Sequence, residues 1–237
     1  MTDAVVFNGI HTLDFHEVRW NVVRIPEVSV RISEAQEIWD KEELSSFNFY
    51  NFLVSEDQVF QGNIKLKSLA TAIVQVGLYD RYLRFFQRPK YLIGAGNGDS
   101  PLKVAAGLLS LEDLLKKSRA CEMERPSSLL QLADTPFLSG MSLADYTLYV
   151  FSPQKNTFET LIDGNKDFNV VAREAIEEHR VQKFVNIGPG SLLINRNKDE
   201  YSMADIQILE SIDIDPMLSW FWREVQQHEV PQQQMAQ

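Results

Sequence analysis

Cysteine is almost absent from the sequence, because Cys121 is the only one in 237 residues. A single cysteine excludes an intrachain disulfide and any zinc site built on two or four cysteines, and it favours a reducing compartment. Long apolar runs are absent too, so no stretch of about 18 residues could span a membrane. The opening MTDAVVFNG lacks the basic and apolar regions of a signal peptide. We therefore expect a cytoplasmic protein without membrane association, metal or cofactor.

Positive charge is also scarce. Lys and Arg number 23 against 33 Asp and Glu, which gives a net charge of −10. A strongly acidic chain repels phosphate backbones, so nucleic acid is not an expected partner. A hydrophobic content of 44% and a charged content of 24% are those of a globular protein. We expect one domain over residues 1–228 and a disordered tail over 229–237.

The charge is unevenly distributed. Residues 65–90 contain six cations and one anion, a net charge of +5, which leaves −15 for the rest of the chain. Such a stretch is either the solvated face of a helix or a docking surface for an acidic partner. If it is a docking surface, Arg81 and Arg84 are its candidate contacts.

Periodicity predicts alternating strands and helices. We expect strands at 4–7, 27–32, 91–93 and 181–187, and helices at 34–44, at 64–86, from 101, from 110, at 168–179 and within 204–228. This order predicts an α/β fold with a mostly parallel sheet flanked by helices. In such sheets ligands bind at the turns that follow the carboxyl ends of the strands.

The turn after the predicted strand at 91–93 is rich in glycine. It reads Gly94, Ala95, Gly96, Asn97, Gly98 and Asp99. Three functional interpretations are open: an anion site on helix amides, a dinucleotide or S-adenosylmethionine loop, or a nucleophile elbow. A tight turn that needs glycine for steric reasons is the structural alternative. The dinucleotide loop requires an acid about 20 residues on, and the nearest acids, Glu112 and Asp113, lie in a predicted helix.

Four segments resemble one family in the right order. The run YLIGAGNGDSPLKVAAGLLSLEDLL at 91–115 resembles the elbow region of the malonyl-CoA:acyl-carrier-protein transacylases and polyketide synthase acyltransferase domains. VQVGLY at 74–79 and FVNIGPG at 184–190 resemble two further motifs of that family, and VVFNG at 5–9 resembles a third more loosely. The resemblance covers residues 1–125 and 166–195 and implies the acyltransferase fold.

The resemblance does not extend to the reacting groups. The family uses a serine nucleophile, and the alignment places Gly96 at that position, after Ala95 and before Asn97. Glycine has no side chain, so no acyl-enzyme can form there. The family's oxyanion glutamine aligns with Ile10, and its carboxylate-binding arginine aligns with Cys121. We therefore predict no catalytic residue and a degenerate member of the family.

Other groups do not replace the missing ones. The family's histidine aligns with Phe151. Ser100 is expected to begin a helix, and Cys121 has no histidine beside it in the sequence. His11 and His16 follow the first strand and could approach the edge of the sheet.

The chain is short for this family. About 92 residues separate Gly96 from Gly188, fewer than the family's ferredoxin-like subdomain and the core together require. We expect that subdomain to be absent or vestigial.

Binding without reaction is the leading functional hypothesis. The partner would be an acyl carrier protein, a synthase component or a second copy of the chain, with the aromatic cluster Trp220, Phe221 and Trp222 as a candidate interface. One alternative is a non-reacting binder of coenzyme A or phosphate. Its ligand would lie on the turn at 94–99 and on a second turn formed by Gly188, Pro189 and Gly190. Another is an enzyme of a different class, such as a methyltransferase, with Asp99 or His11 as acid or base.

Overall fold

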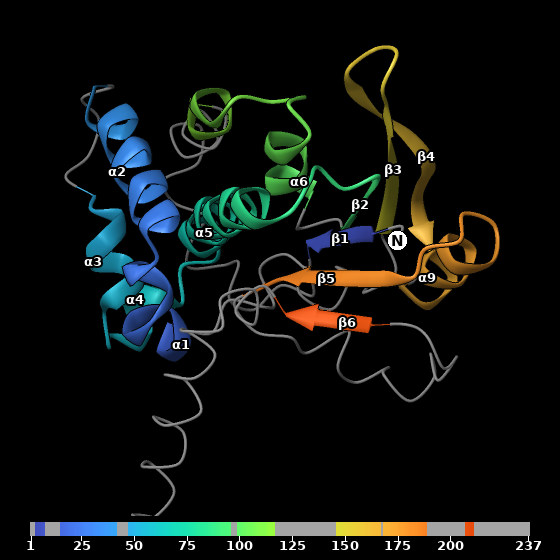
Figure 1. Cartoon of the computed structure of the whole chain (residues 1–237). Helices are drawn as coiled ribbons and strands as arrows, with labels where there is room; N and C mark the ends of the chain where they lie inside the picture. Colours follow the sequence, from blue (N-terminus) through green and yellow to red (C-terminus); the bar gives the residue numbers. More distant parts are fainter. Residues whose placement is uncertain are drawn as a thin grey trace, which may run out of the picture.

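The computed structural model describes residues 3–7, 15–41, 47–95, 99–116, 146–166, 168–188 and 207–210. One sheet carries helices on both of its faces (Figure 1). The elements in chain order are β1 (Asp3–Phe7), α1 (Phe15–Trp20), η2 (Val22–Arg24), α2 (Pro26–Lys41), α3 (Phe49–Val54), α4 (Gln58–Gln61), α5 (Ile64–Phe85), β2 (Tyr91–Ala95), α6 (Asp99–Ala105), β3 (Tyr146–Ser152), β4 (Thr157–Lys166), α9 (Phe168–Glu177), β5 (Lys183–Ile187) and β6 (Gln207–Glu210).

The sheet has six strands in the order β4-β3-β2-β1-β5-β6. β1 pairs in parallel with both β2 and β5, and β5 pairs in parallel with β6. The hairpin of β3 and β4 extends the sheet next to β2 with antiparallel pairing. The expected mostly parallel sheet is therefore confirmed. All the described strands belong to this one sheet, so the described residues include no separate ferredoxin-like sheet.

Alternation along β1 divides the core into two layers. Val5 and Phe7 face the layer that contains α5 and α6, and Ala4 and Val6 face the layer that contains α9. All four are fully buried. Strands covered on both faces have no polar side to present to water, which is why the sequence there is continuously apolar.

Helix α5 forms as expected for 64–86. The side chain of Asn63 caps its first turn by accepting a hydrogen bond from the backbone N–H of Leu66. α5 packs closely on α2 at Gly77, where a Cβ would lie 2.6 Å from the Cα of Val28. The absence of a side chain at this position lets the two helices approach.

The strand expected at 27–32 is wrong, because these residues lie in α2. Val28 and Ile32 are buried as the alternation predicted, but Val30 is 63% exposed. The buried residues of α2 are Val28, Ile32, Ala35 and Trp39. These fall at intervals of three and four residues, and Pro26 opens the helix at a position that tolerates a missing N–H.

The helix expected within 204–228 is wrong at 207–210, which form β6. This strand pairs with β5 from Lys183 to Asn186. A short apolar run is compatible with either a strand or a helix. Here it forms a strand because it pairs with the side of β5 that β1 does not occupy. The aromatic cluster at 220–222 and the tail at 229–237 lie outside the described residues.

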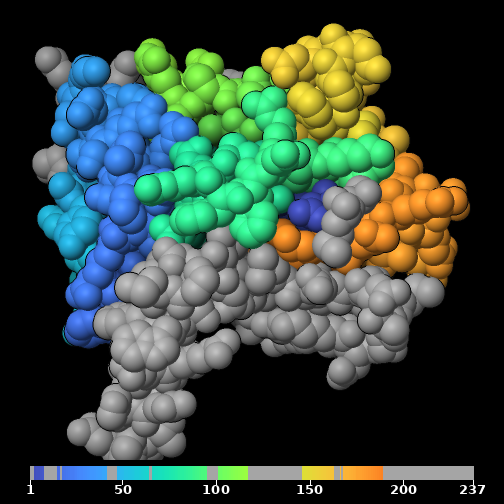
Figure 2. All heavy atoms as spheres, viewed as in Figure 1, coloured from blue at the N-terminus to red at the C-terminus, as the bar shows by residue number. Residues whose placement is uncertain are grey.

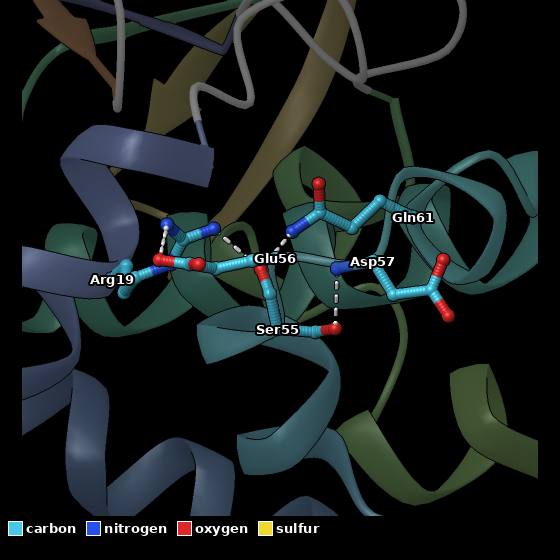
Figure 3. A network of polar contacts seen from close by, with 5 residues as sticks. All are labelled: Arg19, Ser55, Glu56, Asp57 and Gln61. Carbon is cyan, nitrogen blue, oxygen red and sulfur yellow. Dashed lines mark hydrogen bonds and ion pairs between the residues drawn. The ribbon is translucent and has the colours of Figure 1, made fainter.

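A polar network joins α1 to the loop between α3 and α4 (Figure 3). The guanidinium of Arg19 donates to the Glu56 carboxylate at 2.9 Å and to the Ser55 carbonyl at 2.5 Å. The Gln61 amide donates to that same carbonyl. The Ser55 hydroxyl accepts from the backbone N–H of Asp57 at 3.0 Å. The network fixes α1 to α4 and has a structural role.

Candidate functional site at the carboxyl edge of the sheet

The parallel strands bring the two glycine turns to the same edge. Phe7 of β1 pairs with Gly94 of β2 on one side and with Ile187 of β5 on the other. Because neighbouring strands lie about 4.8 Å apart, the ends of β2 and β5 are separated by about 10 Å. The strand arrowheads of β1 and β5 point the same way (Figure 1). The structure therefore places Gly94 and Gly188 at one edge, where α/β proteins bind ligands.

The centre of each turn lies outside the described residues. Strand β2 ends at Ala95 and α6 begins at Asp99, so residues 96–98 connect them. Gly188 follows β5, and residues 189–190 come next. Gly96, Asn97, Gly98, Pro189 and Gly190 therefore remain predictions from the sequence as site residues.

Gly94 has a steric role. A Cβ at Gly94 would lie 2.5 Å from Cδ1 of Leu102, which is fully buried on α6. The glycine thus permits α6 to pack against the end of β2. This contact accounts for Gly94 without a ligand.

Some of the residues after the turn that match the family's motif lie at the ends of helices. Gly107 has φ +73°, the left-handed conformation that favours glycine. It ends α6 in a Schellman motif, in which Leu108 N–H donates to the Lys103 carbonyl at 2.9 Å and Gly107 N–H donates to the Val104 carbonyl at 3.0 Å.

The helix expected from 110 forms, and Ser110 caps it. The hydroxyl of Ser110 accepts from the backbone N–H of Asp113 at 3.0 Å and contacts its carboxylate at 2.7 Å. Residues 111–116 are helical. These matched residues maintain the fold whether or not the chain catalyses a reaction.

Gln75 was not singled out by sequence reasoning as a site residue. It is fully buried on α5, and its side-chain amide donates to the backbone carbonyl of Ile187 at 3.2 Å. It therefore ties α5 to the end of β5, immediately before Gly188. A glutamine within the otherwise apolar run at 72–79 was the available signal.

Two tyrosines of α5, Tyr79 and Tyr82, lie in the core layer between α5 and the sheet. Tyr79 packs on Phe7 with ring centroids 5.7 Å apart, and Tyr79 stacks on Tyr82 at 6.1 Å. Burial raises the pKa of both phenols above the ordinary value. Both are therefore neutral at physiological pH, and neither supplies a base to the carboxyl edge.

Phe151 lies at the opposite edge of the sheet from the glycine turn. β3 runs antiparallel to β2, so Tyr146 pairs with Ala95 while Val150 pairs with Tyr91. Phe151 N–H donates to the Lys90 carbonyl at 2.8 Å. Five residues of strand separate Lys90 from Ala95, a span of about 16 Å. The position that aligned with the family's histidine is therefore remote from the turn, whatever residue occupies it.

The two described histidines, His16 and His179, also lie away from the glycine turn. His179 packs on Tyr91, at the start of β2, with ring centroids 5.5 Å apart. His16 is on the exposed face of α1. His11 and Cys121 lie outside the described residues.

Within the described ranges no group of three or more His, Cys, Asp or Glu side chains is arranged to hold a metal ion. No helix there is long and apolar enough to cross a bilayer.

The two candidate interface arginines differ in exposure. Arg81 is 4% exposed and lies 3.3 Å from the carboxylate of Glu27. Its guanidinium is therefore buried in an ion pair within the protein. Arg84 pairs with the same carboxylate at 2.8 Å, but 65% of its side chain is exposed. Of the two, only Arg84 is accessible to a partner.

Solved structures identify the fold. No protein-family model and no curated protein sequence matches this chain. The malonyl-CoA:ACP transacylase of Synechocystis superposes with a TM-score of 0.59 at 13% identity over 89% of this chain and 97% of the other. FabD from Acinetobacter baumannii gives 0.61 at 14% identity over 96% and 99%. This chain has the acyltransferase fold.

The same fold occurs in multidomain synthases. The acyltransferase domain from the second module of the salinomycin polyketide synthase superposes with a TM-score of 0.61 at 14% identity, over 88% of this chain and 68% of the other. At such identities the likeness establishes the acyltransferase fold alone.

Proposed function

We propose that this chain is a catalytically inactive protein of the acyltransferase fold, which acts by binding a protein partner. The observation that carries the proposal is Gly96. It falls in the three-residue connection between β2 and α6, where the fold's nucleophile elbow lies. Acyl transfer through an acyl-enzyme requires an oxygen or sulfur nucleophile at that position, and glycine supplies neither.

The other reacting groups support the same proposal. Ile10 stands at the position of the oxyanion glutamine and Cys121 at that of the carboxylate-binding arginine. A nucleophile and its base act as a unit, and losing one member removes most of the rate. Loss of several members together is expected of a protein released from catalysis.

An acyl carrier protein is the partner we propose. One structural neighbour, at a TM-score of 0.57 and 11% identity, is a malonyl transacylase in complex with a type II polyketide synthase acyl carrier protein. Carrier proteins are acidic, and this chain has a cationic segment between residues 65 and 90. A cationic surface attracts an acidic partner over several ångströms and orients its approach.

The alternatives have less support. A methyltransferase or dinucleotide enzyme needs an acid at the end of the next strand, beside the glycine turn. Among the described residues, the next strand after β2 is β3, which is antiparallel to β2 and ends at the opposite edge. A phosphate site at the start of α6 would depend on the dipole of a helix of only seven residues, which is weaker than that of a long helix.

The test combines binding with turnover. The purified chain is titrated with a holo acyl carrier protein by calorimetry, and malonyl transfer from malonyl-CoA to that carrier protein is then followed in the same mixture. We expect binding without transfer above the uncatalysed rate, while an active transacylase added as a control gives full transfer. Malonyl transfer that depends on this chain would refute the proposal.

A further inference from the structure

Cations and aromatic rings gather where α5 ends. We name this surface the α5 end patch and define it by Arg84, Phe85, Arg88, Lys90 and Phe151. Arg84, Arg88 and Lys90 are exposed, and Phe85 is 50% exposed. The C-terminal part of α5 and the residues after it lie on the visible surface (Figure 2).

Aromatic rings hold the cations of the patch in place. The guanidinium of Arg88 lies 5.1 Å from the ring centroid of Phe151 and donates to Asn156 at 3.4 Å. The ammonium of Lys90 lies 5.1 Å from the ring of Tyr91. Side chains fixed by stacking lose less conformational entropy on binding than free ones. Arginine and exposed aromatic rings are also the residues that contribute most at protein interfaces.

The patch has an excess of positive charge. The patch has three cations, Arg84, Arg88 and Lys90, and Arg84 shares the Glu27 carboxylate with the buried Arg81. Three exposed cations and this one shared carboxylate leave an excess of positive charge, in a chain whose net charge is −10. Of the neighbouring ion pairs, Lys155 pairs with Glu159 and Lys183 with Asp3, while Arg31 pairs with both Asp80 and Glu34.

The patch is at the wrong edge of the sheet to serve the glycine turn. Lys90 directly precedes β2, whereas the turn follows it, about 16 Å away along the strand. A partner docked here would not present an acyl group to residues 94–99. Retaining a cationic surface at this edge has no use in acyl transfer, but it is compatible with binding alone.

We propose that the α5 end patch docks the acidic surface of an acyl carrier protein and leaves the glycine turn unoccupied. This inference rests on the proposed function for the identity of the partner. It adds the surface that is used and the prediction that the carrier's phosphopantetheine arm plays no part in binding.

The test compares three single charge reversals, measured by calorimetry against one purified acyl carrier protein in apo and holo forms. Arg88→Glu alters the patch. Arg173→Glu alters an exposed cation on α9, on the other face of the sheet, and serves as the matched control. Lys103→Glu alters an exposed cation one turn into α6, the helix after the glycine turn. Thermal unfolding of each variant verifies that it is folded.

We expect Arg88→Glu to weaken binding about tenfold, as reversal of a charge in an exposed complementary surface does. The other two variants should change it less than twofold, and apo and holo carrier proteins should bind equally. Loss of binding in Lys103→Glu but not in Arg88→Glu, or clearly tighter binding of the holo form, would overturn the proposal.

The outcomes also separate this inference from the proposed function. If the unaltered chain binds the carrier protein and Arg88→Glu has no effect, only the docking surface is wrong. If the unaltered chain binds neither form, both the surface and the choice of partner are wrong. Acyl transfer would refute the inactive role alone.

Discussion

At the scale of single residues, several features that resemble a binding motif serve packing. Gly94 opens a glycine-rich turn, yet its contact with Leu102 explains the absence of a side chain. Gly107 is explained by a helix cap with φ +73°. Gly96 lies outside the described residues. The proposed inactive role depends on the alignment of Gly96 with the family's serine.

We predict that Gly94→Ala destabilises the fold by about 1–3 kcal/mol, since the new methyl group would overlap the side chain of Leu102. Urea unfolding measures the change. In the double variant with Leu102→Ala the effects should be clearly non-additive, because the shortened side chain makes room for the methyl group. Full additivity would show that the contact does not exist.

Glu27 gives a prediction about pH. Partial burial disfavours its charged form, but the hydrogen bond from Arg84 and the charge of Arg81 prevail and hold the pKa of Glu27 below its ordinary value. A lowered folded-state pKa stabilises the protein above the unfolded value of about 4.3, and this stabilisation is lost as pH falls through the folded-state pKa. Glu27→Gln should therefore be destabilising at pH 7.

The measurement is urea unfolding of both proteins at pH 7, 5 and 3.5. We expect the difference between them to be constant from pH 7 to 5 and to shrink below that. Arg81 is 4% exposed and would lose the negative charge of the Glu27 carboxylate beside it, so the loss at pH 7 should reach about 3 kcal/mol. A difference that is independent of pH down to 3.5 would contradict the pairing.

At the scale of elements, the sequence predicts the central strands and long helices well. β1, β2, β5, α5 and α9 form where they were expected, because each has a continuous apolar pattern several residues long. The strand predicted at 27–32 was wrong. The alternation of Val28, Val30 and Ile32 is typical of a strand, but the spacing of the buried residues from Val28 to Ala35 and Trp39 is that of a helix. The helix predicted at 207–210 was wrong because so short a segment has little preference of its own, and it forms a strand by pairing with β5.

The site was predicted only in part for a related reason. Glycine turns at the ends of parallel strands meet at one edge, so the juxtaposition of Gly94 and Gly188 followed from the fold class. The direction of β3 has no sequence signal, so the location of Phe151 at the opposite edge could not be foreseen. The contact between Gln75 and Ile187 joins residues 112 positions apart, which no local pattern encodes.

The crossing of α2 and α5 tests the packing of these two elements. Alanine at Gly77 would gain about 1 kcal/mol of helix propensity, but its Cβ would lie 2.6 Å from the Cα of Val28. A backbone atom cannot rotate away, so we predict net destabilisation of about 1–3 kcal/mol in thermal or urea unfolding. Val28→Ala should not rescue it, in contrast to Leu102→Ala at Gly94. A stabilised Gly77→Ala protein would mean that the helices are further apart.

At the scale of the whole molecule, the acyltransferase fold persists at identities of 14% or less to its solved neighbours. The matched residues described here bury the sheet, cap helices and close turns, and these roles suffice to preserve the architecture. Among the described residues, Arg84, Arg88 and Lys90 lie at the amino edge of the sheet, and Gly94 and Gly188 lie at its carboxyl edge.

Intact-protein mass spectrometry tests the absence of a nucleophile most directly. The purified chain is incubated with excess malonyl-CoA, and separately with acetyl-CoA, beside an active malonyl-CoA:acyl-carrier-protein transacylase as the positive control. We predict that the mass of this chain stays unchanged while the control gains one acyl group. A gain of one acyl group on this chain that hydroxylamine removes would contradict the account, because it would reveal a covalent intermediate on a residue other than Gly96.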